Sequence, residues 1–89
     1  MAGHRPSAFR REVGQRLRQL RLAAGITSQE QLAERAGVHR TYIGRLERGE
    51  SGVTVDALCT ILAALPLSLA EFFRPFDQSR RVGSPRRRD

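Results

Sequence analysis

The segment from Gln29 to Arg48 reads QEQLAERAGVHRTYIGRLER and decides the fold that the chain is expected to adopt. Two short helical patterns flank Gly37, which suits the backbone of a tight turn. Two short helices that cross steeply over such a turn must share one core. Ala33 is small at their closest approach, and five apolar residues supply the core: Leu32, Ala36, Val38, Ile43 and Leu46. The segment therefore predicts two helices, from about residue 29 to 36 and from 39 to 48, with Gly49 at the stop.

A longer helix is expected before this pair. Apolar residues recur there at spacings of three and four, Ser7 is a plausible N-cap, and Gly25 can close the helix in a left-handed conformation. Its inward face is predicted to carry Phe9, Val13, Leu17, Leu20 and Ala24.

Two further helices are expected after the pair. The first begins at a Thr54 cap and ends at Pro66, and the second covers residues 69–74, with Ser68 and Glu71 forming a capping box. The first should bury Val55, Leu58, Leu62 and Leu65. No segment alternates with the period of a strand, so the sequence predicts an all-α fold of five short helices.

The ends of the chain differ from its middle in composition. Residues 1–6 and 77–89 are polar, rich in Arg and poor in large apolar side chains, which is typical of flexible basic tails. The organised part is expected over residues 7–76, and 89 residues leave no room for a second domain.

All sixteen basic residues of the chain are Arg, and its formal net charge is +7 at pH 7. Arg binds phosphates and guanine edges through a rigid fork of donors, so a polyanionic partner is the first expectation. A GC-rich genome would also replace Lys with Arg, but that bias does not account for the net charge.

Several classes of function find no support in the sequence. Cys59 has no partner for an intramolecular disulfide, is expected in the core, and favours a reducing cytoplasm. The longest apolar run, residues 61–65, is far below the ~20 residues that span a membrane. His4, His39 and Cys59 are too few and too badly spaced for a zinc site. No nucleophile has a plausible base, so we do not expect an enzyme. The sequence also gives no sign of a bound metal, a cofactor or a small-molecule effector, and none is expected.

The same segment resembles the helix-turn-helix of the Cro/phage-repressor (Xre) type. The run HRTYIGRLERGE at residues 39–50 is similar to the recognition helix of restriction–modification controller proteins. The resemblance covers about residues 13–73 and implies a lambda-repressor-like DNA-binding domain, with the motif in its second and third helices. It also implies a transcriptional regulator that binds the major groove of double-stranded DNA as a homodimer.

The resemblance implies which residues read bases. Arg can donate bidentately to guanine, and Thr can offer its methyl to thymine or its hydroxyl to either base type. On the helical wheel these side chains lie opposite the core, so they face solvent or DNA, and a merely solvated charged face is the competing interpretation. The implied positions are Arg40, Thr41 and Arg45, flanked by His39 and Gly44.

Phosphate contacts are implied at both ends of the motif. Ser28 and Gln29 match the start of the second helix, where family members hold a phosphate and where the helix dipole suits an anion. Arg48 and Arg35 are further candidates, although Arg35 is equally an ordinary surface charge. Tyr42 could contact the backbone, stack on a base step or pack under its helix.

Arg21 and Glu47 match a pair that forms a salt bridge between the first and third helices of phage repressors. Its implied role is to orient the recognition helix, because a buried pair is weak evidence for stability. Two unrelated exposed charges are the competing interpretation.

The sequence departs from the family in three places. Many members have one residue fewer before Gln29, which leaves Thr27 or Ser28 as the cap. Pro66 stands where a Gly commonly closes the fourth helix, and Pro cannot adopt positive φ. Gly44 costs its helix about 1 kcal/mol relative to Ala, which indicates either close approach to DNA or a missing base contact.

The C-terminal helix region holds more apolar side chains than one short helix can bury. We expect Leu69 and one of Phe72 and Phe73 to pack inward and the others to meet a second copy. The competing interpretation places all of them, Leu65 included, in the monomer core. The candidate dimer residues are Leu67, Phe72, Phe73 and Phe76.

Two other functions compete with an operator-binding dimer. One is a protein-interaction module such as an antitoxin, whose basic surface and C-terminal segment bind a partner protein. The other is a protein that coats RNA or DNA without sequence preference. Base-reading side chains gathered on one helix favour the sequence-specific regulator.

Overall fold

The computed structural model describes residues 7–76, and these form five helices without a strand. The helices are α1 (Ala8–Ala23), α2 (Gln29–Ala36), α3 (Arg40–Glu47), α4 (Val55–Ala63) and α5 (Leu69–Phe73). The all-α prediction is confirmed. The two segments interpreted as tails, residues 1–6 and 77–89, lie outside the described residues.

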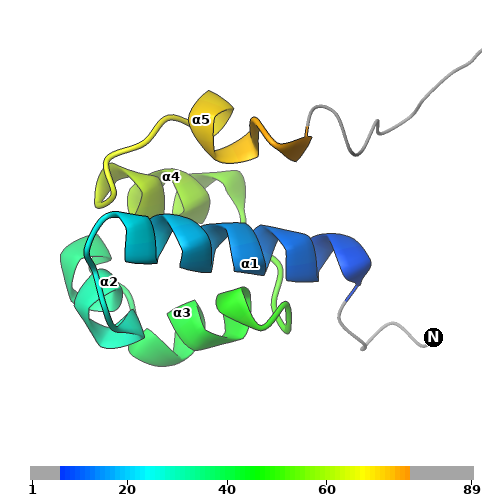
Figure 1. Cartoon of the computed structure of the whole chain (residues 1–89). Coiled ribbons are helices and arrows are strands. Elements are labelled where there is room, and N and C mark those ends of the chain that lie inside the picture. Colours follow the sequence, from blue (N-terminus) through cyan, green and yellow to red (C-terminus); the bar gives the residue numbers. More distant parts are fainter. Residues whose placement is uncertain (1–6, 77–89) are drawn as a thin grey trace, which may run out of the picture.

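The long helix α1 forms the centre of the arrangement (Figure 1). The pair α2 and α3 lies on one side of it, and α4 and α5 lie on the other. The most extensive contacts between helices are those of α3 with α1 and with α2. The helix α3 is therefore held from two directions.

Side chains at the helix starts explain why the helices begin where they do. Ser7 and Thr54 each accept a hydrogen bond from a backbone N–H of the first turn, and Ser28 and Ser68 each form a full capping box. Each such cap satisfies an N–H that has no partner in the helix. Ser28 is thus the cap of α2, and Thr27 instead donates its N–H to Gln31 Oε1 at 2.9 Å.

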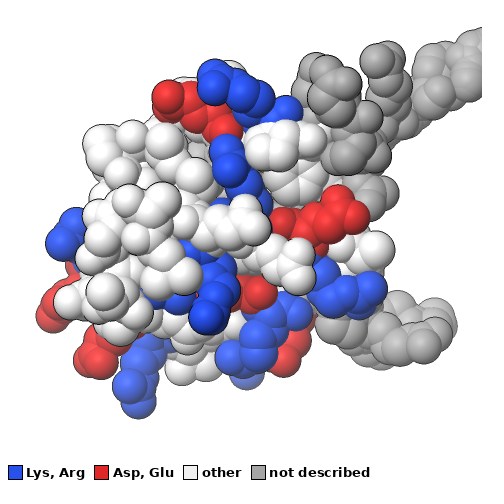
Figure 2. All heavy atoms as spheres, in the orientation of Figure 1, with Lys and Arg blue, Asp and Glu red and all other residues white. Residues whose placement is uncertain are grey.

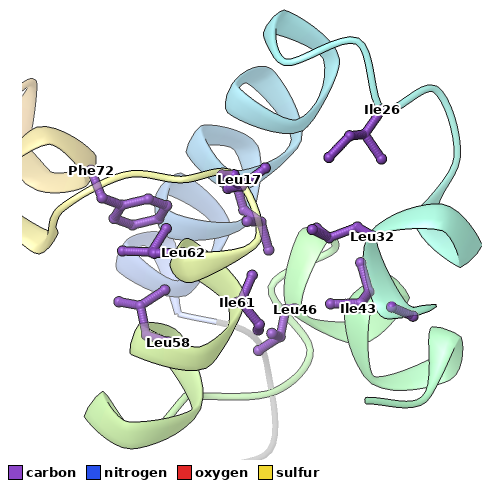
Figure 3. Packing of buried hydrophobic residues seen from close by; sticks show 11 residues of the cluster. Leu17, Ile26, Leu32, Ile43, Leu46, Leu58, Ile61, Leu62 and Phe72 are labelled. Carbon is purple, nitrogen blue, oxygen red and sulfur yellow. The ribbon is translucent and has the colours of Figure 1, made fainter. Parts of the chain in front are cut away.

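One hydrophobic core joins all five helices (Figure 3). Leu17 of α1 lies between the side chains of α2 and α3 and those of α4 and α5. Ile26, from the loop between α1 and α2, is also fully buried and was absent from the sequence prediction. The fully buried large side chains are Leu17, Ile26, Leu32, Ile43, Ile61, Leu62 and Phe72.

Five side chains predicted to lie inside the protein are exposed, and one of them is Ala24, the C-cap of α1. Val55 is 66% exposed, because α4 buries Ile61 with Leu58 and Leu62, which turns its first residue outward. Cys59, on the same helix, is exposed as well. Phe9 and Leu69 are each 37% exposed, since they lie at the first turns of α1 and α5, at the edge of the core.

The corner after α4 is closed without a residue of positive φ. The Leu62 carbonyl accepts hydrogen bonds from the N–H groups of Leu65 at 3.0 Å and Leu67 at 2.8 Å. Pro66 has no N–H, so it stands between the two donors at no loss of a hydrogen bond. The chain therefore turns after α4 without the glycine that commonly closes this helix in the family.

Arg16 attaches α5 to α1. Its guanidinium donates from Nε to the Phe72 carbonyl and from Nη2 to the Glu71 carbonyl, both at 2.8 Å. Carbonyls in the last turn of a helix lack helical partners, and a cation there is favoured by the helix dipole. A short helix of five residues thereby gains a fixed position on α1.

Gly14 lets α1 and α3 approach each other closely. A Cβ atom built there would lie 2.6 Å from the Glu47 carbonyl oxygen and even closer to that of Leu46. These are backbone atoms, which cannot rotate away as a side chain can. The crossing of α1 and α3 therefore requires glycine at this position.

We expect Gly14→Ala to destabilise the protein by ~1–3 kcal/mol through overpacking, even though alanine by itself favours a helix by about 1 kcal/mol. Thermal unfolding followed by circular dichroism checks this expectation. Gln15→Ala, an exposed change on the same helix, is the matched control and should change stability by less than ~0.5 kcal/mol. Equal stability of the Gly14 variant and the wild type would contradict the close crossing.

Candidate nucleic-acid interface

The helix α3 presents one polar face and one apolar face. Ile43 and Leu46 are buried against the other helices. His39, Arg40, Thr41 and Arg45, the side chains predicted to read bases, are all exposed. The face of α3 that carries them is exposed to solvent, so it is open to contact with DNA.

Arg21 and Glu47 form a buried bidentate ion pair. Nε of Arg21 lies 2.7 Å from Oε2 of Glu47, Nη2 lies 3.1 Å from Oε1, and the two side chains are 3% and 2% exposed. The third nitrogen, Nη1, donates to the Ile26 carbonyl at 3.0 Å. The predicted ion pair therefore forms, and it joins α1, α3 and the loop before α2.

Gln29 extends this network to the start of α2. Its Nε2 donates to Glu47 Oε1 at 3.0 Å, so one carboxylate accepts from both Arg21 and Gln29. An ionised acceptor gives stronger hydrogen bonds than a neutral one. The side chain predicted to hold a phosphate is thus fixed by the residue that also fixes α3.

Arg48 forms a second bidentate pair on the surface. Its Nε and Nη2 donate to Glu50 at 2.9 and 3.1 Å. The hydrogen bond raises the pKa of Arg48 and lowers that of Glu50. Both side chains are about half exposed, so the pair orients Arg48 more than it stabilises the fold.

Gly44, predicted to flank the base-reading side chains, lies in different surroundings from the exposed positions of α3. It is buried, and the side chains of Gln29 and Arg48 lie over the place where its Cβ would be. Tyr42 is half-buried and packs against the core, as one of its three interpretations required. These two residues therefore differ in exposure from the four side chains that are predicted to read bases.

Arg35 and Arg40 occupy different surroundings. Arg35 is exposed in the last turn of α2, roughly 9 Å along the helix axis from Gln29. Arg40 begins α3 and lies 3.8 Å from Glu30, in a pair whose side chains are both 70% exposed. Such an exposed pair is weak, so Arg40 can turn to another partner at little cost.

Sequence reasoning missed Arg18. A surface hollow of about 380 Å³ lies at the N-terminus of α2, and its lining includes Arg18, Ser28, Gln29 and Arg40. Arg18 and Arg21 are three residues apart on α1 and so share one side of that helix. This spacing, read from the predicted pair of Arg21 with Glu47, could have identified Arg18.

Charged residues of both signs mark the surface around the motif. In Figure 2, basic and acidic side chains alternate along the lower edge of the molecule, where α2 and α3 lie in Figure 1.

Within residues 7–76 there is no cluster of three or more potential metal-binding side chains. In that same part of the chain, no helix combines the length and the apolar character that crossing a membrane requires.

The prediction for Phe72 as a dimer contact is wrong, because its side chain is fully buried in the monomer. Its ring stacks with that of Phe76 at 6.5 Å and meets that of Phe73 edge-on at 4.9 Å. Leu67, Phe73 and Phe76 are partly exposed.

Comparison with known proteins agrees with this geometry. The family model described as Helix-turn-helix matches residues 17–72. Control protein C.BamHI of Bacillus amyloliquefaciens is 44% identical over 62 residues, which cover 66% of this chain and 76% of the relative. Control protein C.SmaI of Serratia marcescens is 55% identical over 42 residues, which cover 47% of this chain and 50% of the relative.

A solved structure supports the same assignment. The crystal structure of the clp gene regulator ClgR from C. glutamicum superimposes with a TM-score of 0.73 at 28% identity. The match covers 86% of this chain and 97% of that one. The chain therefore belongs to the helix-turn-helix family of the Xre type, as a DNA-binding transcriptional regulator related to restriction–modification control proteins.

Proposed function

We propose that this regulator binds a palindromic operator as a dimer and reads each half-site with α3. The observation that carries the proposal is the division of α3 into two faces. Arg40, Thr41 and Arg45 are exposed on one face, and the other is anchored in the core. The proposal includes a cytoplasmic site of action, and control of a restriction–modification system is its most specific form, since two relatives are named control proteins.

The proposed interface divides base reading from phosphate binding. Arg40 and Arg45 can each donate two hydrogen bonds to a guanine, whereas Thr41 can contact either base type. Ser28, Gln29, Arg18 and Arg48 would hold the DNA backbone, which sets the register of α3 in the groove but carries no sequence information. The proposal involves neither catalysis nor an effector.

Two copies are needed for a biological site. One helix of eight residues reads about four or five base pairs, which is too few to identify a site among the many competing sequences of a genome. A two-fold dimer would double the site and place its two recognition helices about 34 Å apart, one turn of DNA.

An apolar groove offers a surface for the second copy. It has a volume of about 360 Å³ and is lined from α1, α4, α5, the loop after α3 and Leu46 on the core side of α3. Its lining includes Phe9, Val55 and Leu69, three of the four large apolar side chains that residues 7–76 expose, together with Phe73. Apolar surface gathered in this way is typical of a contact between proteins. Because the groove lies outside α2 and the reading face of α3, a second copy there leaves the DNA-binding face open.

We expect Arg40→Ala to weaken binding of the preferred duplex by about 1–3 kcal/mol and to relax selection at one base pair. Gln29→Ala should weaken binding of preferred and random duplexes by the same factor, because a phosphate contact ignores sequence. Titration of both duplexes at one salt concentration, after selection of the preferred site from a random pool, measures these effects. Equal losses on the two duplexes for Arg40→Ala would remove Arg40 from the base-reading set.

We expect Val55→Glu to dissociate the dimer, because it places a charge in the apolar groove without removing a core side chain. Leu22→Glu is the matched control, since Leu22 is 45% exposed but lies outside the groove. Sedimentation at micromolar concentration should give a mass of 10.0 kDa for the Val55 variant and twice that for the wild type and the control. A wild type that sediments as a monomer would defeat the dimer.

A further inference from the structure

Glu50 lies just after the C-terminal end of α3, where a negative charge does not stabilise the helix. The helix dipole favours cations at that end and disfavours a carboxylate. The position of Glu50 is nevertheless well defined, since its backbone N–H donates to the Arg45 carbonyl at 2.8 Å. Gly49 precedes it with a φ of 77°, and a Cβ atom there would lie 2.9 Å from backbone atoms of Arg11. The loop that carries Glu50 therefore lies directly against α1.

The carboxylate of Glu50 occupies the side of Arg48 that suits a phosphate best. Nε and Nη2 of Arg48 donate to its two oxygens at 2.9 and 3.1 Å, so two N–H groups point at one anion. Arginine binds carboxylates and phosphates through this same fork of donors. The hydrogen bond with Arg48 lowers the pKa of Glu50, and the charge of Arg45 lowers it further. Glu50 is thus an anion held where a phosphate of DNA would otherwise bind.

This pair lies on the side of the molecule that is proposed to face DNA. The guanidinium of Arg48 reaches back over Gly44, and the side chain of Gln29 lies over the same point of α3. Both members of the pair are about half exposed, and such pairs add little to the stability of a fold. A phosphate that takes the fork of Arg48 must break two hydrogen bonds and leave Glu50 unpaired beside a polyanion. The effect of Glu50 should therefore fall on DNA binding rather than on folding.

We propose that Glu50 is an internal substitute for phosphate, which holds the fork of Arg48 until DNA displaces it and so limits the affinity of the regulator for DNA. This inference rests on the proposed function and adds to it a residue that restrains binding. The restraint acts on every DNA sequence alike, because a phosphate contact carries no base information. A chain with a formal net charge of +7 otherwise favours any DNA through its charge alone.

The test compares the wild type with Glu50→Gln, Arg48→Ala and the double variant. Glutamine keeps the size of the side chain and removes its charge, so Arg48 is released. Each protein is titrated with the preferred duplex and with a random duplex at several salt concentrations, and each is melted without DNA. Glu50→Gln should melt as the wild type does, yet bind both duplexes about three- to tenfold more tightly. Its log–log salt slope should steepen by about 0.9, the value of one neutralised phosphate.

A matched control separates the release of Arg48 from a change in net charge. Glu34→Gln removes an exposed carboxylate from α2 and leaves the pair of Arg48 with Glu50 intact. It should tighten binding less than Glu50→Gln does. In the Arg48→Ala background, Glu50→Gln should tighten binding no more than Glu34→Gln does in the wild type, because the two members of the pair act together.

Four results would overturn the inference. Unchanged binding by Glu50→Gln would show that the carboxylate does not compete with DNA, and weaker binding would show that it orients Arg48 for DNA instead. A change confined to one base pair would make Glu50 a base contact. A full gain in the Arg48→Ala background would show that Glu50 acts without Arg48.

Failure of the proposed function gives a different result. In that case the wild type binds preferred and random duplexes equally, and Arg40→Ala weakens both by the same factor. The restraint by Glu50 is still measured on the random duplex, so the two failures are distinguished.

Discussion

The carboxylate of Glu47 is the group on which the geometry of the interface depends. It accepts hydrogen bonds from Arg21 of α1 and Gln29 of α2 while being part of α3, so three helices meet at one buried charge. Removing one member of a buried ion pair commonly costs about 3–5 kcal/mol, because the other charge stays without compensation. An apolar replacement of the whole network could preserve stability. It would lose the directional bonds that set the angle of α3 and the position of Gln29.

The polar interface is built on a small core that allows little adjustment. Phe72 and Leu17 bring α5 and α1 together, and Ile43 and Leu32 join α3 to α2. Gly14 then brings the backbones of α1 and α3 so close that even a methyl group is excluded. Packing therefore sets the distance between α1 and α3, and the buried charges set their direction. Together, the packing and the buried ion pair fix the position of the exposed side chains of α3.

The sequence predicted the local features of this fold well and the distant ones poorly. Serine and threonine caps depend only on neighbouring residues, and Ser7, Thr54 and Ser68 cap the helices that they were expected to cap. Of the two residues left open before α2, Ser28 is the cap. The inward face of α4 depends on how the helix is rotated against its neighbours, and Val55 was misplaced for that reason. Gly44 shows the same limit at the interface. Its cost to the helix was visible in the sequence, but the two side chains that require the space come from 15 residues before it and four residues after it.

The attachment of α5 by Arg16 has a consequence for the geometry of DNA recognition. In the proposed dimer, α5 lies at the junction of the two copies, and α1 connects it to the recognition helix. Two hydrogen bonds from one guanidinium make that connection stiff. A stiff connection fixes the distance between the two recognition helices of the proposed dimer. It therefore also fixes how far apart two half-sites must lie to be bound together. An operator with one base pair inserted at its centre would shift one half-site by about 3.4 Å and rotate it by about a tenth of a turn. A protein built in this way would reject it although every base it reads is still present.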